Sequence, residues 1–215
     1  MKEPEIAWWE LRNRQLFFNP STEGNSPKSL TEPVRRFVNS KHFLISGVPA
    51  AGKTWLGNWL ANKRGYVHID AEKDYGTDFD HAGVHAEWDD FLRTGRAAGF
   101  VAAVGHLGKS LVLNWGLPSD ALFIVPALQA EGVEAWWIHA DRSQARTAFV
   151  ERENKKPEGK RISVELFDQQ MDQIERHWLL IERLFGKRMI EGLKTDGSQR
   201  LPEDLWTEIT ARRGE

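Results

Sequence analysis

The stretch GVPAAGKT, Gly47 to Thr54, constrains the fold of this chain more than any other feature of its sequence. It has a glycine, four variable residues, a second glycine, a lysine and a threonine, in that order. The apolar run HFLIS precedes it, and a helical pattern follows. A glycine-rich turn between a strand and a helix points backbone N–H groups inward, beside the positive end of the helix dipole. The stretch therefore predicts a loop that binds phosphate groups.

Short apolar runs alternate with longer amphipathic segments from Lys41 onward, which is typical of strand–helix–strand units. The expected strands lie at residues 42–46, 66–70, 110–115, 134–140 and 188–193. The expected helices lie at residues 53–63, 87–108, 119–131, 142–154, 164–184 and 203–212. This pattern predicts a three-layer α/β/α domain with a five-stranded, mainly parallel sheet. We expect residues 1–40 to form an arm that packs on this domain, which spans residues 41–215.

The composition excludes several classes of site and partner. The chain of 215 residues has no cysteine, so disulfides, zinc–thiolate centres and thiol nucleophiles are excluded. A formal net charge of −2 gives no reason to expect nucleic acid or an anionic membrane as a partner. No apolar run reaches the length of a membrane span, and we expect a cytoplasmic protein. The ten tryptophans fit core packing, an interface or ligand stacking.

Each part of the glycine-rich stretch has an expected task if it binds a nucleoside triphosphate. Gly47 and Gly52 allow the tight turn. Lys53 is expected to reach the β- and γ-phosphates, and the Thr54 hydroxyl to bind Mg²⁺. We assign nucleotide contacts to Gly47, Val48, Pro49, Ala50, Ala51, Gly52, Lys53, Thr54 and Trp55.

The domain resembles the small P-loop kinases of the shikimate kinase, gluconate kinase and adenylate kinase group. The resemblance covers roughly residues 41–213. Its specific part is the stretch Gly47–Thr54, and the other matches concern the order and spacing of motifs. The resemblance implies a phosphotransferase that uses ATP and Mg²⁺, with an acidic motif after the second strand and an arginine-bearing lid after the fourth.

The second expected strand ends in Asp70-Ala71-Glu72, which is similar to the acidic motif of those kinases. Phosphoryl transfer needs a carboxylate that orients the attacking hydroxyl and another group that holds Mg²⁺. We expect Asp70 to hold Mg²⁺ together with Thr54, and Asp70 or Glu72 to position the acceptor. The alternative is a strand that runs into a solvated acidic loop.

An acidic segment follows, with eight acidic residues and one lysine between Asp70 and Asp90. In the resembling kinases this region, here about residues 71–108, helps to form the acceptor pocket. So acidic a pocket should repel an anionic acceptor and suit a neutral polyol, an amine or a cation. Solvated carboxylates are the alternative. His81 and His85 are four residues apart, but no third metal ligand is near them in a known pattern.

The third expected strand departs from the usual pattern. Asn114 stands where many P-loop proteins have an aspartate that binds Mg²⁺ through water. Either Asp70 supplies that carboxylate, or the capacity for hydrolysis is lost. Trp115 follows, and its indole fits core packing and stacking on a ligand equally.

After the fourth expected strand, Arg142, Arg146 and Arg152 lie along one helical pattern, ahead of a lid at about residues 151–163. We assign Arg152 to the charge of the transferring phosphate, as a catalytic residue, and Arg146 to the adenine or phosphate side. Arg142 is a third candidate. The alternative is a solvated helix with i,i+4 ion pairs. Fold analogy also places residues 194–199 near the adenine.

These motifs together predict a Mg²⁺- and ATP-dependent kinase of a small molecule, an alcohol or an amine. One alternative is a toxin-like or antibiotic-modifying kinase of the same fold. A second is a nucleotide-binding regulatory module with little turnover, whose partner docks on a tryptophan-rich surface. The sequence leaves open the acceptor, the choice between ATP and GTP, and the oligomeric state.

Overall fold

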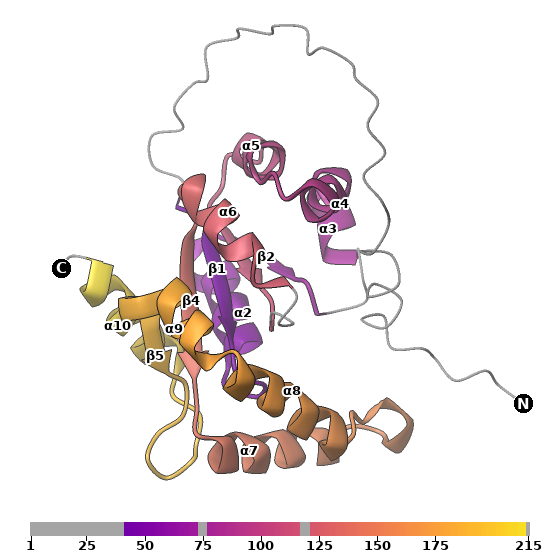
Figure 1. Ribbon diagram of the computed structural model, residues 1–215, viewed down its shortest axis with the longest axis vertical. Helices are drawn as coiled ribbons and strands as arrows, with labels where there is room; N and C mark the ends of the chain where they lie inside the picture. Colours follow the sequence, from indigo (N-terminus) through magenta and orange to yellow (C-terminus); the bar gives the residue numbers. More distant parts are fainter. Residues whose placement is uncertain (1–40, 73–76, 117–120, 214–215) are drawn as a thin grey trace, which may run out of the picture. The chain divides into compact units, whose positions relative to one another are not determined.

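The computed structural model describes residues 41–72, 77–116 and 121–213, which belong to the compact unit Ser40–Glu215 (Figure 1). The expected arm at residues 1–40 lies outside the described residues. The described part forms one five-stranded sheet in the order β2-β3-β1-β4-β5, and every pair of neighbouring strands is parallel. The strands are β1 (Phe43–Gly47), β2 (Val67–Asp70), β3 (Leu111–Asn114), β4 (Glu134–His139) and β5 (Met189–Glu191). The predicted fold class is confirmed, and all five strands lie within one or two residues of their expected bounds.

The helices follow the strands in alternation. Their bounds are α2 (Lys53–Arg64), α3 (Thr77–Ala82), α4 (His85–Thr94), α5 (Ala98–His106), α6 (Ile124–Ala130), α7 (Arg142–Asn154), α8 (Val164–Arg176), α9 (Trp178–Phe185) and α10 (Pro202–Arg213). The single helix expected at residues 87–108 is wrong. Gly95 ends α4 with a left-handed φ of 72°, and α5 starts three residues later, while α3 was not expected. The helix expected at residues 164–184 is two helices, which meet at His177.

The sheet is covered on both faces, as its apolar strands require. β1 and β3 are buried along their whole length, so both faces of these strands need cover. α2 packs on β1, β2 and β3 from one side, together with α10, and α6 and α9 pack on β4 from the other side (Figure 1). All strands run in the same direction, so their carboxyl ends meet at one edge, where ligands bind in open α/β sheets.

Most of the described tryptophans serve the core. Trp88, Trp115, Trp136 and Trp137 are buried. Trp115 lies 5.5 Å from Trp88 between ring centroids, and Trp88 stacks on Phe79 at 4.7 Å. This aromatic cluster attaches α3 and α4 to the carboxyl end of β3, so Trp115 packs in the core rather than at a ligand surface.

In residues 41–72, 77–116 and 121–213 there is no helix with the length and apolar character needed to cross a membrane.

Candidate functional site

The glycine-rich loop, Gly47–Thr54, leaves the central strand β1 and enters α2. Gly47 has a φ of 142°, and a Cβ there would collide with the carbonyl oxygen of Ile138 on β4. Val48 N donates to that same oxygen at 3.0 Å. Glycine at position 47 is therefore required both by the backbone and by the neighbouring strand.

The loop closes into the first turn of α2 without a side-chain cap. Gly52 is left-handed, with a φ of 98°, and precedes Lys53. The first turn of α2 contains no acidic residue, and no side chain accepts from its N–H groups. An uncapped helix N-terminus of this length, behind a glycine-rich turn, fits a bound anion such as a nucleotide phosphate.

Residues that follow β5 contact the phosphate-binding loop. Gln199 Nε2 donates to Ala50 O at 3.1 Å, and Gly192 lies so close to Ala51 O that a Cβ would collide with it. Gln144 Nε2, on α7, donates to Thr195 O at 3.1 Å. Gln199 thus contacts the loop, and the contact of residues 194–199 with adenine stays a prediction.

Lys53 lies across the loop and is almost fully buried, at 6% exposed. Its Nζ donates to Gly47 O and Val48 O, both at 3.1 Å. Nζ also lies 3.8 Å from Glu72 Oε1. The ammonium group is thus held at the mouth of the loop, next to a carboxylate at the end of β2.

Thr54 and Asp70 join α2 to the end of β2. Thr54 Oγ1 donates to Asp70 Oδ2 at 2.9 Å, and Asp70 is 5% exposed. Glu72 N donates to Asp70 Oδ1 at 3.1 Å. Asp70 N donates to Asp78 Oδ2, on α3, at 3.0 Å. A hydroxyl and a buried carboxylate offer the oxygen ligands that Mg²⁺ prefers, so this pair fits the predicted metal site.

Glu72 links the end of β2 to the residues that follow β3. Its side chain is 44% exposed, and Gly116 N donates to its Oε1. A Cβ at Gly116 would collide with this oxygen, so the residue after Trp115 must be small for Glu72 to lie here.

Asn114 lies next to Asp70 in the register of β2 and β3, on the face covered by α2. It is fully buried, and neither atom of its side-chain amide has a hydrogen-bond partner within the described residues. A buried amide without partners costs free energy, and a functional role is one explanation for such a group. Position 114, where many P-loop proteins have an aspartate, thus carries a neutral polar side chain.

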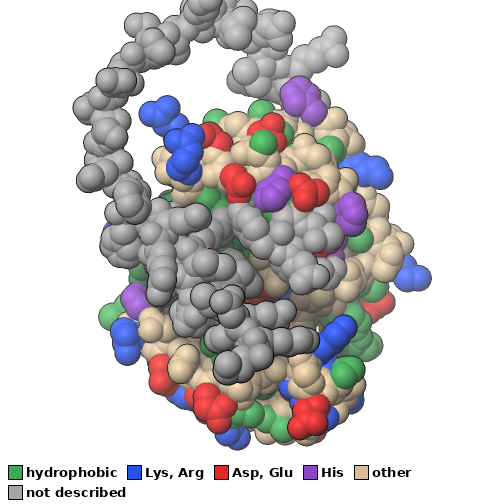
Figure 2. All heavy atoms as spheres, turned by 90° about the vertical axis from the view of Figure 1, so that its right-hand side faces the viewer, with side chains coloured by type: hydrophobic (Ala, Val, Ile, Leu, Met, Phe, Trp, Pro, Cys, Tyr) green, Lys and Arg blue, Asp and Glu red, His purple; other side chains and the backbone are tan. Residues whose placement is uncertain are grey.

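The expected acceptor region contains α3, α4 and α5. His85 Nδ1 lies 2.8 Å from Asp80 Oδ1, and its Nε2 lies 3.6 Å from Asp89 Oδ2. Figure 2 shows carboxylates and histidines gathered on the upper part of the face that it presents. Within the described residues no group of three or more metal-ligating side chains is arranged to hold an ion. Asp80 and Asp89 thus pair with His85 and remain exposed.

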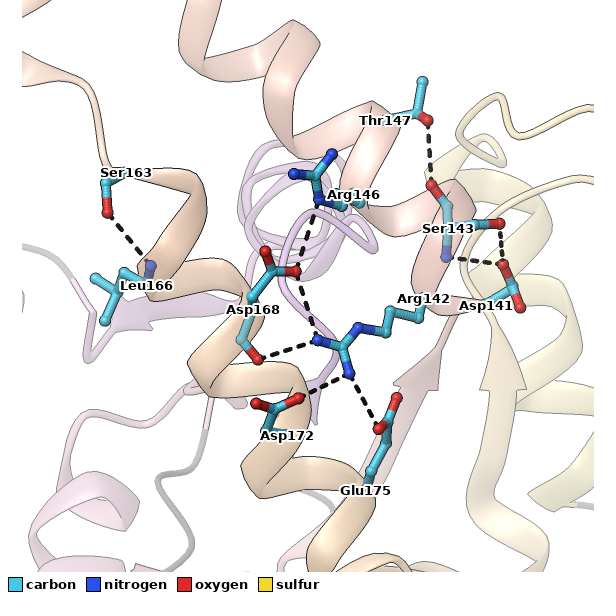
Figure 3. Close-up of polar contacts among 10 residues, drawn as sticks. All are labelled: Asp141, Arg142, Ser143, Arg146, Thr147, Ser163, Leu166, Asp168, Asp172 and Glu175. Atoms are coloured by element: carbon cyan, nitrogen blue, oxygen red, sulfur yellow. Dashed lines mark hydrogen bonds and ion pairs between the residues drawn. The ribbon is translucent and has the colours of Figure 1, made fainter.

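Arg142 and Arg146 connect α7 to α8 (Figure 3). Arg142 Nη1 donates to Asp172 Oδ1 at 2.8 Å and to Glu175 Oε2 at 3.0 Å. The hydrogen bond to Asp172, followed by that to Glu175, raises the pKa of Arg142. Arg146 Nε lies 3.6 Å from Asp168 Oδ1. These arginines hold two helices together through ion pairs between the helices, not through the i,i+4 pairs of the alternative, and their contact with a nucleotide stays a prediction.

Arg152 lies in the last turn of α7 and does not join the cluster of Lys53, Thr54, Asp70 and Glu72. Its Nε donates to Glu153 Oε1 at 2.9 Å, and its Cζ lies 5.0 Å from the centre of the Phe149 ring. The structure thus brings the loop and the acidic motif together, whereas the candidate lid arginines contact carboxylates of α7 and α8. The contacts of Asp78, Gly116 and Gln199 were not predicted, because each is made across a fold that the sequence does not show.

No protein-family model matches the chain. Over 115 residues it is 30% identical to the pentafunctional AROM polypeptide of Lachancea thermotolerans, which covers 51% of this chain and only 7% of that polypeptide. The chain therefore spans a small part of the curated relative that it matches.

Three solved structures with a similar architecture are a gluconokinase and two shikimate kinases. A gluconokinase from Sinorhizobium meliloti matches 81% of this chain and 91% of its own, at 15% identity and a TM-score of 0.45. A shikimate kinase from Bacteroides thetaiotaomicron matches 81% and 99%, at 13% identity and a TM-score of 0.46. A shikimate kinase from Acinetobacter baumannii, in complex with shikimate, matches 81% and 93%, at 18% identity and a TM-score of 0.45. These comparisons agree with the expected resemblance, and at these identities and TM-scores they concern the architecture alone.

Proposed function

We propose that this chain is a Mg²⁺- and ATP-dependent phosphotransferase that acts on a small neutral or cationic molecule with a hydroxyl or amino group. The observation that carries the proposal is the convergence of Lys53, Thr54, Asp70 and Glu72 at the carboxyl ends of β1 and β2. A buried ammonium, a hydroxyl and two carboxylates around an uncapped helix N-terminus are the groups that phosphoryl transfer requires.

The two carboxylates have different surroundings, which suit them to different tasks. Asp70 is buried and accepts from the Thr54 hydroxyl, so it suits the metal side of the site. When bound, Mg²⁺ neutralises charge on the β- and γ-phosphate oxygens. Glu72 is half-exposed and its orientation is fixed by Gly116 N, so it suits the acceptor side.

The transfer step then runs as an in-line displacement. The acceptor oxygen or nitrogen forms a bond to the γ-phosphorus while the bond to the β,γ-bridging oxygen breaks, and ADP leaves with that electron pair. The proton of the acceptor passes to the Glu72 carboxylate. Lys53 exchanges its bonds to Gly47 O and Val48 O for the β- and γ-phosphates, and the lid brings Arg152 to the transferring group.

The charge of the acceptor region supports the choice of acceptor. On α3 and α4 the residues Asp78, Asp80, Glu87, Asp89 and Asp90 precede the first arginine, Arg93, which pairs with Asp90. The resulting negative field disfavours an anionic acceptor. A toxin-like or antibiotic-modifying kinase would share this mechanism and differ only in its substrate.

Asn114 is neutral at a position, next to Asp70, where many P-loop proteins have an aspartate. It therefore favours a second candidate, a nucleotide-binding module with little turnover. Release of ADP over many turnovers separates the two. We expect polyols, amino alcohols or polyamines to stimulate ADP release by the wild type, and shikimate and gluconate, both anions, to stimulate it far less.

Glu72→Gln should bind nucleotide normally and lose roughly 10²–10⁴-fold in kcat, because only the proton acceptor is removed. Lys53→Ala should lose nucleotide binding itself. A wild type that binds Mg·ATP but shows no stimulated turnover with any acceptor would instead establish the binding module.

A further inference from the structure

Besides His42, only three ionisable side chains are buried within residues 41–72, 77–116 and 121–213: Lys53, Asp70 and Glu153. Lys53 and Asp70 lie at the phosphate loop. Glu153 lies near the end of α7, at the start of the expected lid, and the proposed reaction gives it no task. Its side chain is only 5% exposed, which is unusual for a carboxylate on a surface helix.

Glu153 ties together the two ends of the lid segment. Its Oε1 accepts from Lys156 Nζ at 2.9 Å, and its Oε2 accepts from Ile162 N at 2.9 Å. Ile162 directly precedes Ser163, the N-cap of α8. Arg161 Nε donates to Lys156 O at 3.0 Å, so residues 155–162 also close on themselves. One carboxylate thus fixes the end of α7 to the start of α8.

Glu153 remains ionised despite its burial. Burial by itself raises the pKa of Glu153, but hydrogen bonds from Ile162 N, Lys156 and Arg152 outweigh it and hold the pKa below the usual value. Loss of one of these partners would leave a buried charge uncompensated. The hydrogen bonds therefore hold the carboxylate in one position.

The same carboxylate orients Arg152. Both Nε and Nη2 of Arg152 lie 2.9 Å from Glu153 Oε1, while the face of the guanidinium stacks on Phe149. Arg152 nevertheless stays 45% exposed. A guanidinium has five N–H donors, so two contacts with Glu153 leave donors for a phosphate. A pre-oriented arginine loses less conformational freedom when it binds an anion.

We propose that Glu153 is a positioning residue, which fixes the orientation of Arg152 on a preformed unit, residues 151–163, that carries Arg152 to the γ-phosphate. This inference rests on the proposed function. Glu153 should therefore strengthen the binding of ATP but not that of ADP, because only ATP carries the phosphate that Arg152 would contact.

The test measures the dissociation constants of Mg·ATP and Mg·ADP without any acceptor. The variants are Arg152→Ala, Glu153→Gln and the double variant, with Glu151→Gln, an exposed glutamate on the same helix, as the matched control. The wild type should prefer ATP to ADP. Each single variant should reduce that preference roughly tenfold and change ADP binding by less than about twofold. Because Glu153 acts through Arg152, the double variant should be no worse than Arg152→Ala alone.

Three results would overturn the inference: no ATP preference in the wild type, equal losses of ATP and ADP binding in Glu153→Gln, or additive effects in the double variant. If Glu153→Gln does not fold, Glu153→Asp takes its place in the same cycle, because it keeps the charge but withdraws the carboxylate. A wild type that binds neither nucleotide overturns the proposed function, which is a different outcome from unchanged binding in Glu153→Gln.

Discussion

At the scale of single residues, Ala50 is the least expected feature of the phosphate loop. It has a φ of 62°, and within the described residues it is the non-glycine residue with a positive φ. A left-handed conformation costs a residue with a Cβ about 1 kcal/mol. The loop therefore contains local strain at a position where Gln199 also donates to its carbonyl oxygen.

Ala50→Gly should stabilise the nucleotide-free protein by about 0.5–1 kcal/mol, because glycine adopts this φ without strain. Ala51→Gly is the matched control: Ala51 is buried and has no positive φ, so glycine there should destabilise the protein by a similar amount. Urea unfolding of both variants measures the difference. If Ala50→Gly is destabilised as much as Ala51→Gly, the loop is not strained at Ala50.

The meeting of the loop and the acidic motif could be predicted from the sequence, because the spacing of their residues along the chain is typical of a phosphate site. Lys53, Thr54, Asp70 and Glu72 lie together as expected. The position of Glu153 could not be predicted in this way. Its neighbours in the sequence are charged and exposed, and only the closure of residues 155–162 buries it.

At the scale of elements, strands were easier to place than helix ends. Each strand is a short apolar run between turn residues, so its position follows from composition alone. The break between α4 and α5 had a signal, Gly95, but the apolar pattern continues across it. The break at His177 has no glycine or proline, and the apolar stripe continues into α9. It depends on packing that the sequence does not show.

The pairing of β1 with β3 contains a group that responds to pH. His42, just before β1, accepts through Nδ1 from Leu111 N at 3.2 Å, so its proton lies on Nε2. Burial lowers the pKa of His42 below 6.5. Protonation is thus easier in the unfolded chain, and stability should fall as the pH drops through about 6.5 toward the folded-state pKa.

His42→Asn removes this titration but keeps an acceptor for Leu111 N. We expect the free energy of unfolding to decrease more in the wild type than in His42→Asn between about pH 7.5 and pH 5.5. Urea titrations at several pH values measure both slopes. Equal slopes would mean that His42 does not couple protonation to the pairing of β1 and β3.

At the scale of the whole molecule, the parallel sheet explains why distant segments meet. All five carboxyl strand ends lie at one edge, so the loop after β1, the acidic motif after β2 and the support after β5 become neighbours. The sequence predicted that Thr54 of the loop and Asp70 of the acidic motif lie together. It did not predict that the candidate lid arginines are engaged by carboxylates of α7 and α8, because these pairs depend on how the two helices pack.

The central claim is that the loop and Lys53 bind a nucleotide triphosphate with Mg²⁺. Thermal unfolding with and without Mg·ATP tests it most directly, on the wild type, Lys53→Ala and the control Lys63→Ala, an exposed lysine in the last turn of α2. At about 100 times its dissociation constant, a ligand of the folded state adds about 2.7 kcal/mol, which is roughly 5–10 °C in Tm for a chain of this size.

Each variant is compared with its own nucleotide-free Tm, because Lys53 is buried and its loss changes the baseline. The account predicts the full shift in the wild type and in Lys63→Ala, and its loss in Lys53→Ala. A wild type without a shift at millimolar Mg·ATP, or a Lys53→Ala variant that keeps it, would contradict the account.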